Sequence, residues 1–183
     1  MALENADIIE RTIDSQRVFD GLILHIDHMT NELPNGKTAP REVARHIGAS
    51  AVIPVDGDGN AWLVRQYRAA VDRVLLEIPA GKLDSKDEDR LLAAKRELRE
   101  ETGLTAGRWT HLGDIVTSPG FTDEKISLYL ARDLEAGESH PDDDEFLNVV
   151  RLPFDEVVEM IMRGEITDAK TICGVMMAWK LCR

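Results

Sequence analysis

The strongest constraint on this chain is one helical segment, residues 86–102. Its apolar residues recur at intervals of three or four positions, as in a helix that buries one face. These residues are Leu91, Ala94 and Leu98. We expect Ser85 or Asp87 to cap the first turn and Gly103 to end the helix. The rest of the fold must therefore supply an apolar surface for this helix to cover.

The last turn of this helix holds three acids, Glu97, Glu100 and Glu101. This placement costs stability, because the C-terminal end of a helix is partially negative and carboxylates three or four positions apart repel each other. One reading is a solvated acidic surface that is balanced in part by Arg96 and Arg99. A divalent cation would remove both penalties, and hard oxygen ligands suit Mg²⁺ or Mn²⁺. We therefore predict a metal site at the end of this helix.

The other segments mix strand and helix patterns without a strict βαβ order, so the fold class is α+β or mixed α/β. Strands are predicted in residues 17–33, 41–55, 61–68, 74–79, 109–118, 124–134 and 146–153, and further helices in 154–165 and 168–182. The Asp/Gly-rich turn at residues 56–60 predicts that the two strands around it pair as a hairpin.

Composition excludes several classes of protein. With 183 residues, a net charge of −12 and a sequence pI near 4.8, the chain has no basic footprint for nucleic acid or an anionic membrane. No apolar run approaches the roughly 18 residues of a membrane span, and the N-terminus does not resemble a signal peptide. The only cysteines, Cys173 and Cys182, do not suggest a disulfide framework. We expect a cytoplasmic protein.

One stretch resembles a known family signature. Glu88, seven intervening residues and then "RELREETGL" (residues 96–104) resemble the Nudix box, found in hydrolases that cleave nucleoside diphosphates linked to another moiety. Six residues separate Gly81 from Glu88 where the family has five, but the extra residue falls in a loop ahead of the helix. The resemblance implies a Nudix fold, a mixed β-sheet sandwiched between helices, over residues 46–183. Residues 1–45 would form an N-terminal strand arm.

The resemblance also implies roles for individual residues. Glu97 and Glu101 would bind Mg²⁺ (Mn²⁺ being a possible substitute), with Glu100 alongside and the backbone carbonyl of Ala80 as a further ligand. Arg96 would hold the glutamates by ion pairing, and Glu88 would support them. Mg²⁺ neutralises a diphosphate and makes bound water more acidic, which agrees with this assignment.

The segments around the box resemble the ADP-ribose pyrophosphatase subfamily. They are "LVRQYR" (63–68), "LLEIPAGKLD" (75–84), "SPGFTDEKISLYLARDL" (118–134) and "GEITDAKT" (164–171). We expect Arg68 to bind the substrate diphosphate, since its guanidinium matches phosphate oxygens, unless it faces solvent. Arg41 and Glu42 align with positions that handle the adenine end, partly across a dimer interface; otherwise they are an exposed strand end. Glu77 either supports the site or points to solvent.

The base that activates water is predicted from a loop beyond the box. Similar enzymes use, or are proposed to use, a glutamate there, and Glu145 lies next to the following strand. Asp142, Asp143 and Asp144 are close alternatives, and Glu138 is a distant one. The non-functional alternative is a solvated acidic loop without a catalytic role.

The resulting prediction is a homodimeric, Mg²⁺-dependent hydrolase that converts ADP-ribose to AMP and ribose 5-phosphate. One alternative is a diphosphatase for another nucleotide sugar such as GDP-mannose. A non-catalytic nucleotide sensor is a second, although such domains commonly lose box glutamates that this chain retains. An acidic module that binds a basic protein is a third.

Overall fold

The computed structural model describes residues 8–137 and 146–182. It has the predicted α+β composition, with three helices and ten strands in the described residues. In chain order they are β1 (Arg11–Asp20), β2 (His25–Glu32), β3 (Thr38–Arg45), β4 (Ala49–Pro54), β5 (Asn60–Arg68), β6 (Arg73–Glu77), β7 (Ala80–Lys82), α1 (Arg90–Thr102), β8 (Leu104–Val116), β9 (Lys125–Ala136), β10 (Leu147–Pro153), α2 (Phe154–Met162) and α3 (Ala169–Cys182). They form two compact units, residues 1–46 with 116–124, and residues 47–115 with 125–183.

The first unit is built on an antiparallel sheet in the order β1-β2-β3. The turn "PNGK" (residues 34–37) joins β2 to β3, with Gly36 at a positive φ of 78°. Residues 116–124 join this unit through a parallel bridge between Ala44 and Thr122. All ten residues of β1 are exposed, and several are large apolar side chains that a single copy of this unit leaves in solvent.

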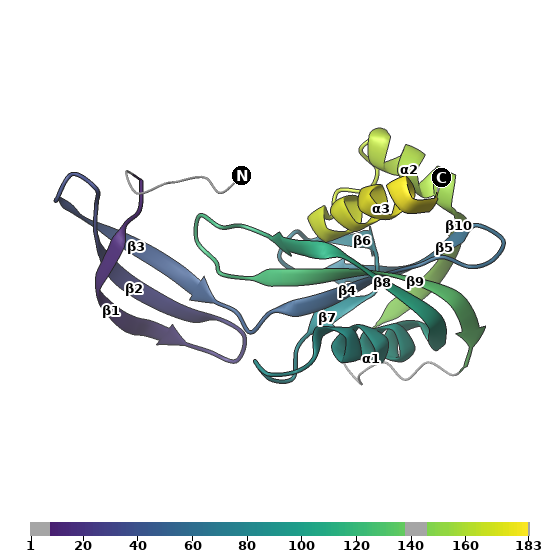
Figure 1. Cartoon of the computed structure of the whole chain (residues 1–183), viewed down its shortest axis with the longest axis horizontal. Helices are drawn as coiled ribbons and strands as arrows, with labels where there is room; N and C mark the ends of the chain where they lie inside the picture. The colour runs from purple at the N-terminus through teal and green to yellow at the C-terminus, as the bar shows by residue number, and fades with distance from the viewer. Residues whose placement is uncertain (1–7, 138–145, 183) are drawn as a thin grey trace. The chain divides into compact units, whose positions relative to one another are not determined.

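The second unit contains two sheets, one in the order β7-β4-β9-β8 and one in the order β10-β5-β6. β4 is parallel to β9 and antiparallel to β7, so the larger sheet is mixed. Helix α1 covers one face, and α2 and α3 lie on the other (Figure 1). Because helices cover both faces, all six residues of β4 are buried, and the strand is an unbroken run of small or apolar side chains rather than an alternating pattern.

Two apolar clusters follow from this layering. On the α1 side, Val52 of β4 packs with Ala94 and Leu98, and Leu91 is partly buried against them, so the predicted helix stripe is confirmed. On the other side, the alternate β4 residues Ala51 and Ile53 pack with residues of α2 and α3. The helix that carries the acids is therefore anchored on the central strand of the sheet.

Two local predictions were wrong. β4 and β5 do not form a hairpin ladder, because both edges of β4 are taken by β7 and β9, and only a bridge between Val55 and Ala61 remains. Helix α1 begins at Arg90 rather than near residue 86. Its cap is Asp89, whose side chain accepts hydrogen bonds from the backbone N–H groups of Leu91 and Leu92. Gly103, at a φ of 71°, ends the helix as predicted.

Candidate functional site

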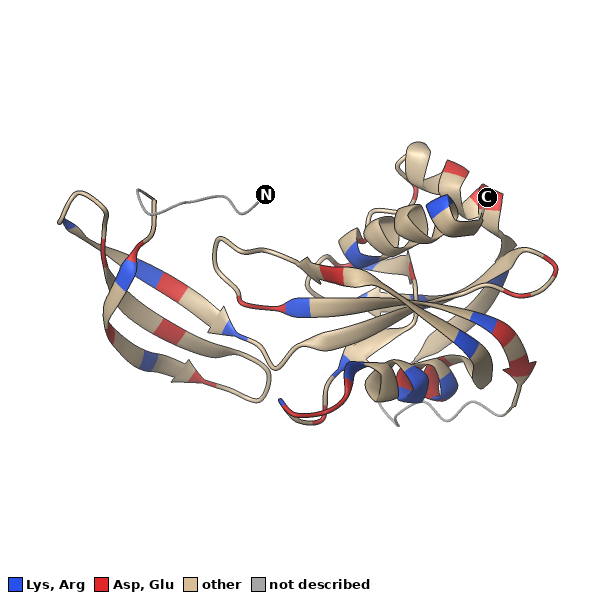
Figure 2. Cartoon of the chain, in the orientation of Figure 1, with Lys and Arg blue, Asp and Glu red and all other residues tan. Residues whose placement is uncertain are grey.

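Helix α1 buries two of its three terminal glutamates. Glu97 and Glu101 are 7% and 2% exposed, while Glu100 is partly open to solvent. Figure 2 shows acidic and basic residues side by side along this helix. Burying a carboxylate is costly unless charge and hydrogen bonds compensate it. The position of Glu97 and Glu101 beside the apolar stripe therefore indicates a site built for positive charge.

Gly81 of β7 has no side chain, so the Glu97 carboxylate can lie against the backbone of this strand. A Cβ atom at Gly81 would lie 2.2 Å from Glu97 Oε1, so glycine is what allows this approach. Ala80, whose carbonyl is the predicted ligand, is the neighbour of Gly81 in the same short strand. The predicted ligands Ala80 and Glu97 are thus on adjoining elements, α1 and β7.

Arg96 contacts four carboxylates in α1, here called the acidic helix, and in the loop ahead of it. Its Nη1 donates to Glu97 Oε1 at 2.6 Å and to Glu100 Oε2 at 3.1 Å. It also forms ion pairs with Glu88 and Asp84, each at 3.5 Å. Burial opposes the charged guanidinium, but the carboxylates, Glu97 foremost, outweigh it and raise the pKa of Arg96. Sequence reasoning gave Arg96 this ion-pairing role but missed Asp84, which lies in the loop ahead of the helix.

Arg68, the predicted diphosphate ligand, forms a two-pronged ion pair with Glu77. Its Nε and Nη2 donate to the two carboxylate oxygens at 2.8 Å each. Glu77 is 1% exposed, so the alternative that it points to solvent was wrong. The hydrogen bond to Glu77 is the main cause that raises the pKa of Arg68, and the charge of Glu101 adds to it. Arg68 therefore lies within the electrostatic field of the acidic helix.

Lys170 is a site candidate that sequence reasoning missed. It donates to the same Glu77 carboxylate and also binds Asp168 at 3.0 Å. Burial of Glu77 favours its neutral form, yet Arg68 and Lys170 together lower its pKa and keep it charged. Lys170 lies in "GEITDAKT", a segment whose resemblance to the subfamily does not by itself indicate what the lysine does.

Arg41 and Glu42, the residues predicted for the adenine end of the substrate, belong to the first unit. Arg41 lies in β3 of the first unit, where it binds Glu10 and the carbonyl of Pro40, and Glu42 pairs in register with His28 of β2. The predicted base Glu145, and its alternatives Glu138, Asp142, Asp143 and Asp144, lie outside the described residues.

The donor chemistry of α1 and β7 fits a hard divalent cation. Within residues 8–137 and 146–182, no three His, Cys, Asp or Glu side chains already converge tightly enough to hold a metal ion. The set that is present consists of oxygens: the buried carboxylates of Glu97 and Glu101 on α1, and the backbone carbonyl of Ala80 on β7, the strand that Glu97 approaches at Gly81. Oxygen ligands of this type suit Mg²⁺, which keeps several waters and needs few protein ligands.

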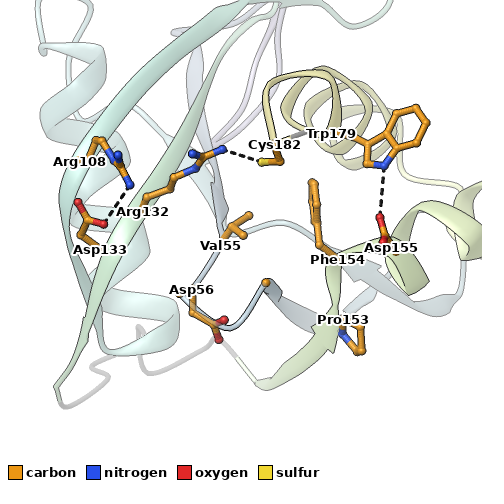
Figure 3. Close-up of a pocket in the computed structure, with 12 residues that line it drawn as sticks. Val55, Asp56, Arg108, Arg132, Asp133, Pro153, Phe154, Asp155, Trp179 and Cys182 are labelled. Carbon is orange, nitrogen blue, oxygen red and sulfur yellow. Dashed lines mark hydrogen bonds and ion pairs between the residues drawn. The ribbon is translucent and has the colours of Figure 1, made fainter.

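Two cavities of ligand size differ in charge. One of about 560 Å³ runs along α1 and has three cations and one acid in its lining: Lys95, Arg96, Arg99, Glu100, Thr105, Ala106 and Trp109. The other, of about 480 Å³, lies at the end of β4 near α3, as Figure 3 shows. There Arg108 pairs with Asp133, Arg132 donates to Cys182, and three aspartates outnumber the two arginines. Of these two cavities, the one along α1 has the net positive lining that suits an anion.

Comparison with known proteins identifies relatives over nearly the whole chain. The model of the NUDIX domain family matches residues 44–174. A methanol dehydrogenase activator from Bacillus methanolicus is 41% identical over 91% of this chain and 90% of its own length. An ADP-ribose pyrophosphatase from Bacillus subtilis (strain 168) is 40% identical over the same shares. A GDP-mannose pyrophosphatase from Cronobacter sakazakii is 34% identical over 72% of this chain and 76% of its own length.

A solved structure supports the fold. The crystal structure of an ADP compounds hydrolase superposes with a TM-score of 0.82, covering 94% of this chain and 93% of that one at 23% identity. None of the helices in the described ranges is long and apolar enough to cross a membrane.

Proposed function

The chain belongs to the NUDIX family, and on that basis we propose that it hydrolyses the diphosphate bond of ADP-ribose to AMP and ribose 5-phosphate. The observation that carries this proposal is the 40% identity to an ADP-ribose pyrophosphatase over 91% of the chain. The acidic helix supports it, because Glu97, Glu100 and Glu101 are all present where a diphosphatase needs to hold a cation.

Glu97, Glu101 and the carbonyl of Ala80 would hold Mg²⁺, with Glu100 alongside. When bound, Mg²⁺ supplies positive charge against the diphosphate and makes the attacking water more acidic. Arg96 keeps Glu97 and Glu100 in place, because one guanidinium nitrogen donates to both carboxylates.

Arg68 binds the diphosphate in this proposal. Two of its nitrogens are held by Glu77, while Nη1 makes no hydrogen bond within the part of the chain that the structure describes. That nitrogen is the donor available to a phosphate oxygen. Water attacks one phosphorus, the bond from phosphorus to the bridging oxygen breaks, and the proton of the water passes to a base.

Glu145 is our candidate for that base. Glutamates that hold a cation are weak bases, so a carboxylate from beyond the box is better suited. Glu145→Gln should lower kcat by about 10²–10⁴-fold with little change in KM or in the Mg²⁺ requirement. A loss below tenfold would transfer the role to Asp142, Asp143 or Asp144, or to a mechanism without a protein base.

The proposal includes a homodimer built on the arm of residues 1–45. Large apolar side chains of the β1–β2 hairpin are exposed, namely Ile13, Val18, Phe19, Leu22, Ile23 and Leu24. Their burial would favour pairing with a second copy, and Arg41 and Glu42 would then serve the adenine end of the substrate near the interface. A 20.4 kDa species alone at micromolar concentration in a sedimentation experiment would contradict the dimer.

The free cysteines Cys173 and Cys182 suit a reducing compartment, so we place the protein in the cytoplasm.

One assay tests the function directly. Purified protein is incubated with ADP-ribose, with and without Mg²⁺, beside GDP-mannose and other nucleotide sugars, and the products are identified. We expect AMP and ribose 5-phosphate, formed only with the metal. GDP-mannose is the second candidate because of the 34% identity to a GDP-mannose pyrophosphatase, and a higher kcat/KM for it would replace ADP-ribose as the substrate.

A further inference from the structure

The segment that begins α3 is fastened by one aspartate. Asp168 precedes the helix, and its Oδ2 accepts hydrogen bonds from the backbone N–H of Thr171 at 3.0 Å and from the Thr171 hydroxyl at 2.6 Å. The same oxygen accepts from Lys170 Nζ at 3.0 Å. A carboxylate in this position caps the helix start, and here it also fixes the two side chains that follow.

Those two side chains hold the junction between β6 and β7. Lys170 donates to Glu77, and the Thr171 hydroxyl accepts from the backbone N–H of Ile78 at 2.9 Å. Thr171 is fully buried and Glu77 is 1% exposed, so both contacts lie inside the protein. The start of α3 therefore holds two consecutive residues that lie 93 positions earlier in the chain.

Glu77 connects this attachment to Arg68. Its Oε1 accepts from Arg68 Nε, and its Oε2 accepts from both Arg68 Nη2 and Lys170 Nζ. Two cations thus share one buried carboxylate. Without the Lys170 ammonium, the Glu77 carboxylate would interact with Arg68 alone. It would then neutralise more of the positive charge of the guanidinium.

The charges of the cluster give the same result. Arg68 and Lys170 balance Glu77 and Asp168, so the four groups sum to zero. Removing the ammonium leaves a net charge of −1 on the other three groups, with the guanidinium included. The two carboxylates would then offset more than the positive charge of the guanidinium, and Arg68 would attract an incoming diphosphate less strongly.

We propose that Lys170 is a positioning residue, which holds the Arg68 guanidinium ready for the substrate diphosphate through the shared carboxylate of Glu77. This inference rests on the proposed function, in which Arg68 binds the diphosphate. It gives a role to the "DAKT" of residues 168–171: Asp168 orients Lys170, Thr171 fixes the strand junction, and Lys170 balances the charge of the carboxylates around Arg68.

A double-mutant cycle tests this coupling. Lys170→Met, Arg68→Ala and the double variant are compared with the wild type in ADP-ribose hydrolysis at saturating Mg²⁺. We expect Lys170→Met to raise KM about tenfold with kcat within about twofold, because ground-state binding of the diphosphate is weakened. In the Arg68→Ala background the same change should alter KM by less than about twofold, because its target is gone.

Two further variants separate positioning from other roles. Lys170→Arg keeps the positive charge and should restore KM to within about threefold of the wild type. Lys180→Met removes an exposed lysine from the same helix and should leave both kinetic constants unchanged. If Lys170→Met fails to fold, Lys170→Gln replaces it in the cycle, because a glutamine amide can still donate a hydrogen bond but carries no charge.

The outcomes are distinct. An equal rise in KM in both backgrounds, or a fall in kcat alone, would overturn the inference and leave the proposed function standing. A wild-type protein without ADP-ribose turnover would overturn the proposed function and this inference with it. A KM effect that requires Arg68, together with rescue by Lys170→Arg, supports it.

Discussion

Two charged clusters in the second unit are built on opposite principles. At α1, the single guanidinium of Arg96 contacts four carboxylates: Asp84, Glu88, Glu97 and Glu100. Around Glu77, two cations meet two carboxylates, and each charge has an opposite partner within the cluster. The second cluster is electrostatically complete with protein groups alone, whereas the first has an excess of negative charge.

This difference separates the two tasks of a diphosphate site. A cluster with excess negative charge is suited to hold a cation that the chain does not itself provide. A balanced cluster is suited to hold a guanidinium in a fixed place while one of its nitrogens stays available. Mutations that remove a carboxylate should therefore have opposite consequences for stability in the two clusters.

Neutralising the acidic helix should have the largest effect on activity. We expect Glu97→Gln or Glu101→Gln to reduce kcat by more than about 10³-fold, because each removes a proposed ligand of the catalytic cation. Without metal, each variant should be as stable as the wild type or roughly 0.3 kcal/mol more stable, since repulsion on the helix falls. Steady-state kinetics and thermal unfolding without Mg²⁺ measure the two quantities, and activity that survives both changes would exclude this metal site.

Neutralising Glu77 in the balanced cluster should instead lower the free energy of unfolding. Glu77→Gln leaves Arg68 and Lys170 without their shared charge, and breaking a buried ion pair costs about 3 kcal/mol. Urea unfolding at neutral pH would measure this loss in the free energy of unfolding. A variant as stable as the wild type would mean that the ion pairs around Glu77 contribute nothing net.

Gly81→Ala should damage the acidic helix without unfolding it. The added Cβ would clash with the Glu97 carboxylate, which lies at the end of a flexible side chain and can swing away at low cost. We expect kcat to fall about 30-fold, equivalent to roughly 2 kcal/mol, with a change in stability below about 1 kcal/mol. Gly57→Ala, at a turn glycine with open space around it, is the matched control and should keep full activity.

The smallest expected effect is on the pH dependence of stability. The pKa of Glu77 lies below its ordinary value of 4.5, because Arg68 and Lys170 outweigh its burial. Its ionised form therefore adds stability above pH 4.5, and this contribution is lost as the pH falls through the lower, folded-state pKa. The stability gap between the wild type and Glu77→Gln should narrow from about pH 6 to about pH 3 in urea unfolding. A gap that stays constant would show that Glu77 does not titrate differently on folding.

Local sequence patterns predicted the acidic cluster but not the balanced one. Residues 90–103 are contiguous, so helical spacing alone placed Glu97 and Glu101 beside the stripe of Ala94 and Leu98. The Glu77 cluster joins Arg68 to Lys170 across about 100 residues of chain, and no local pattern encodes that contact. The only sequence feature that pointed to the Glu77 cluster is the resemblance of "GEITDAKT" to a subfamily. That resemblance does not say which residues Lys170 contacts.

The fold errors have the same origin. The turn at residues 56–60 is a sound hairpin signal, yet β7 and β9 occupy the edges of β4 and tertiary pairing overrides it. The cap of α1 is Asp89, because its carboxylate accepts hydrogen bonds from the backbone N–H groups of Leu91 and Leu92. Several acids and a serine lie nearby in the sequence, and the sequence alone does not reveal which of them is the cap. Fold class and the buried helix face were predictable; partner choice between distant strands was not.

The melting temperature with and without Mg²⁺ tests the contrast between the clusters most directly. A ligand at 100 times its Kd stabilises the folded state by about 2.7 kcal/mol, which corresponds to a rise of about 5–10 °C for a chain of this length. We expect this rise in the wild type and in Glu77→Gln, whose acidic helix is intact, and none in the Glu97→Gln/Glu101→Gln double variant. An equal rise in the double variant would contradict a cation site at the end of α1.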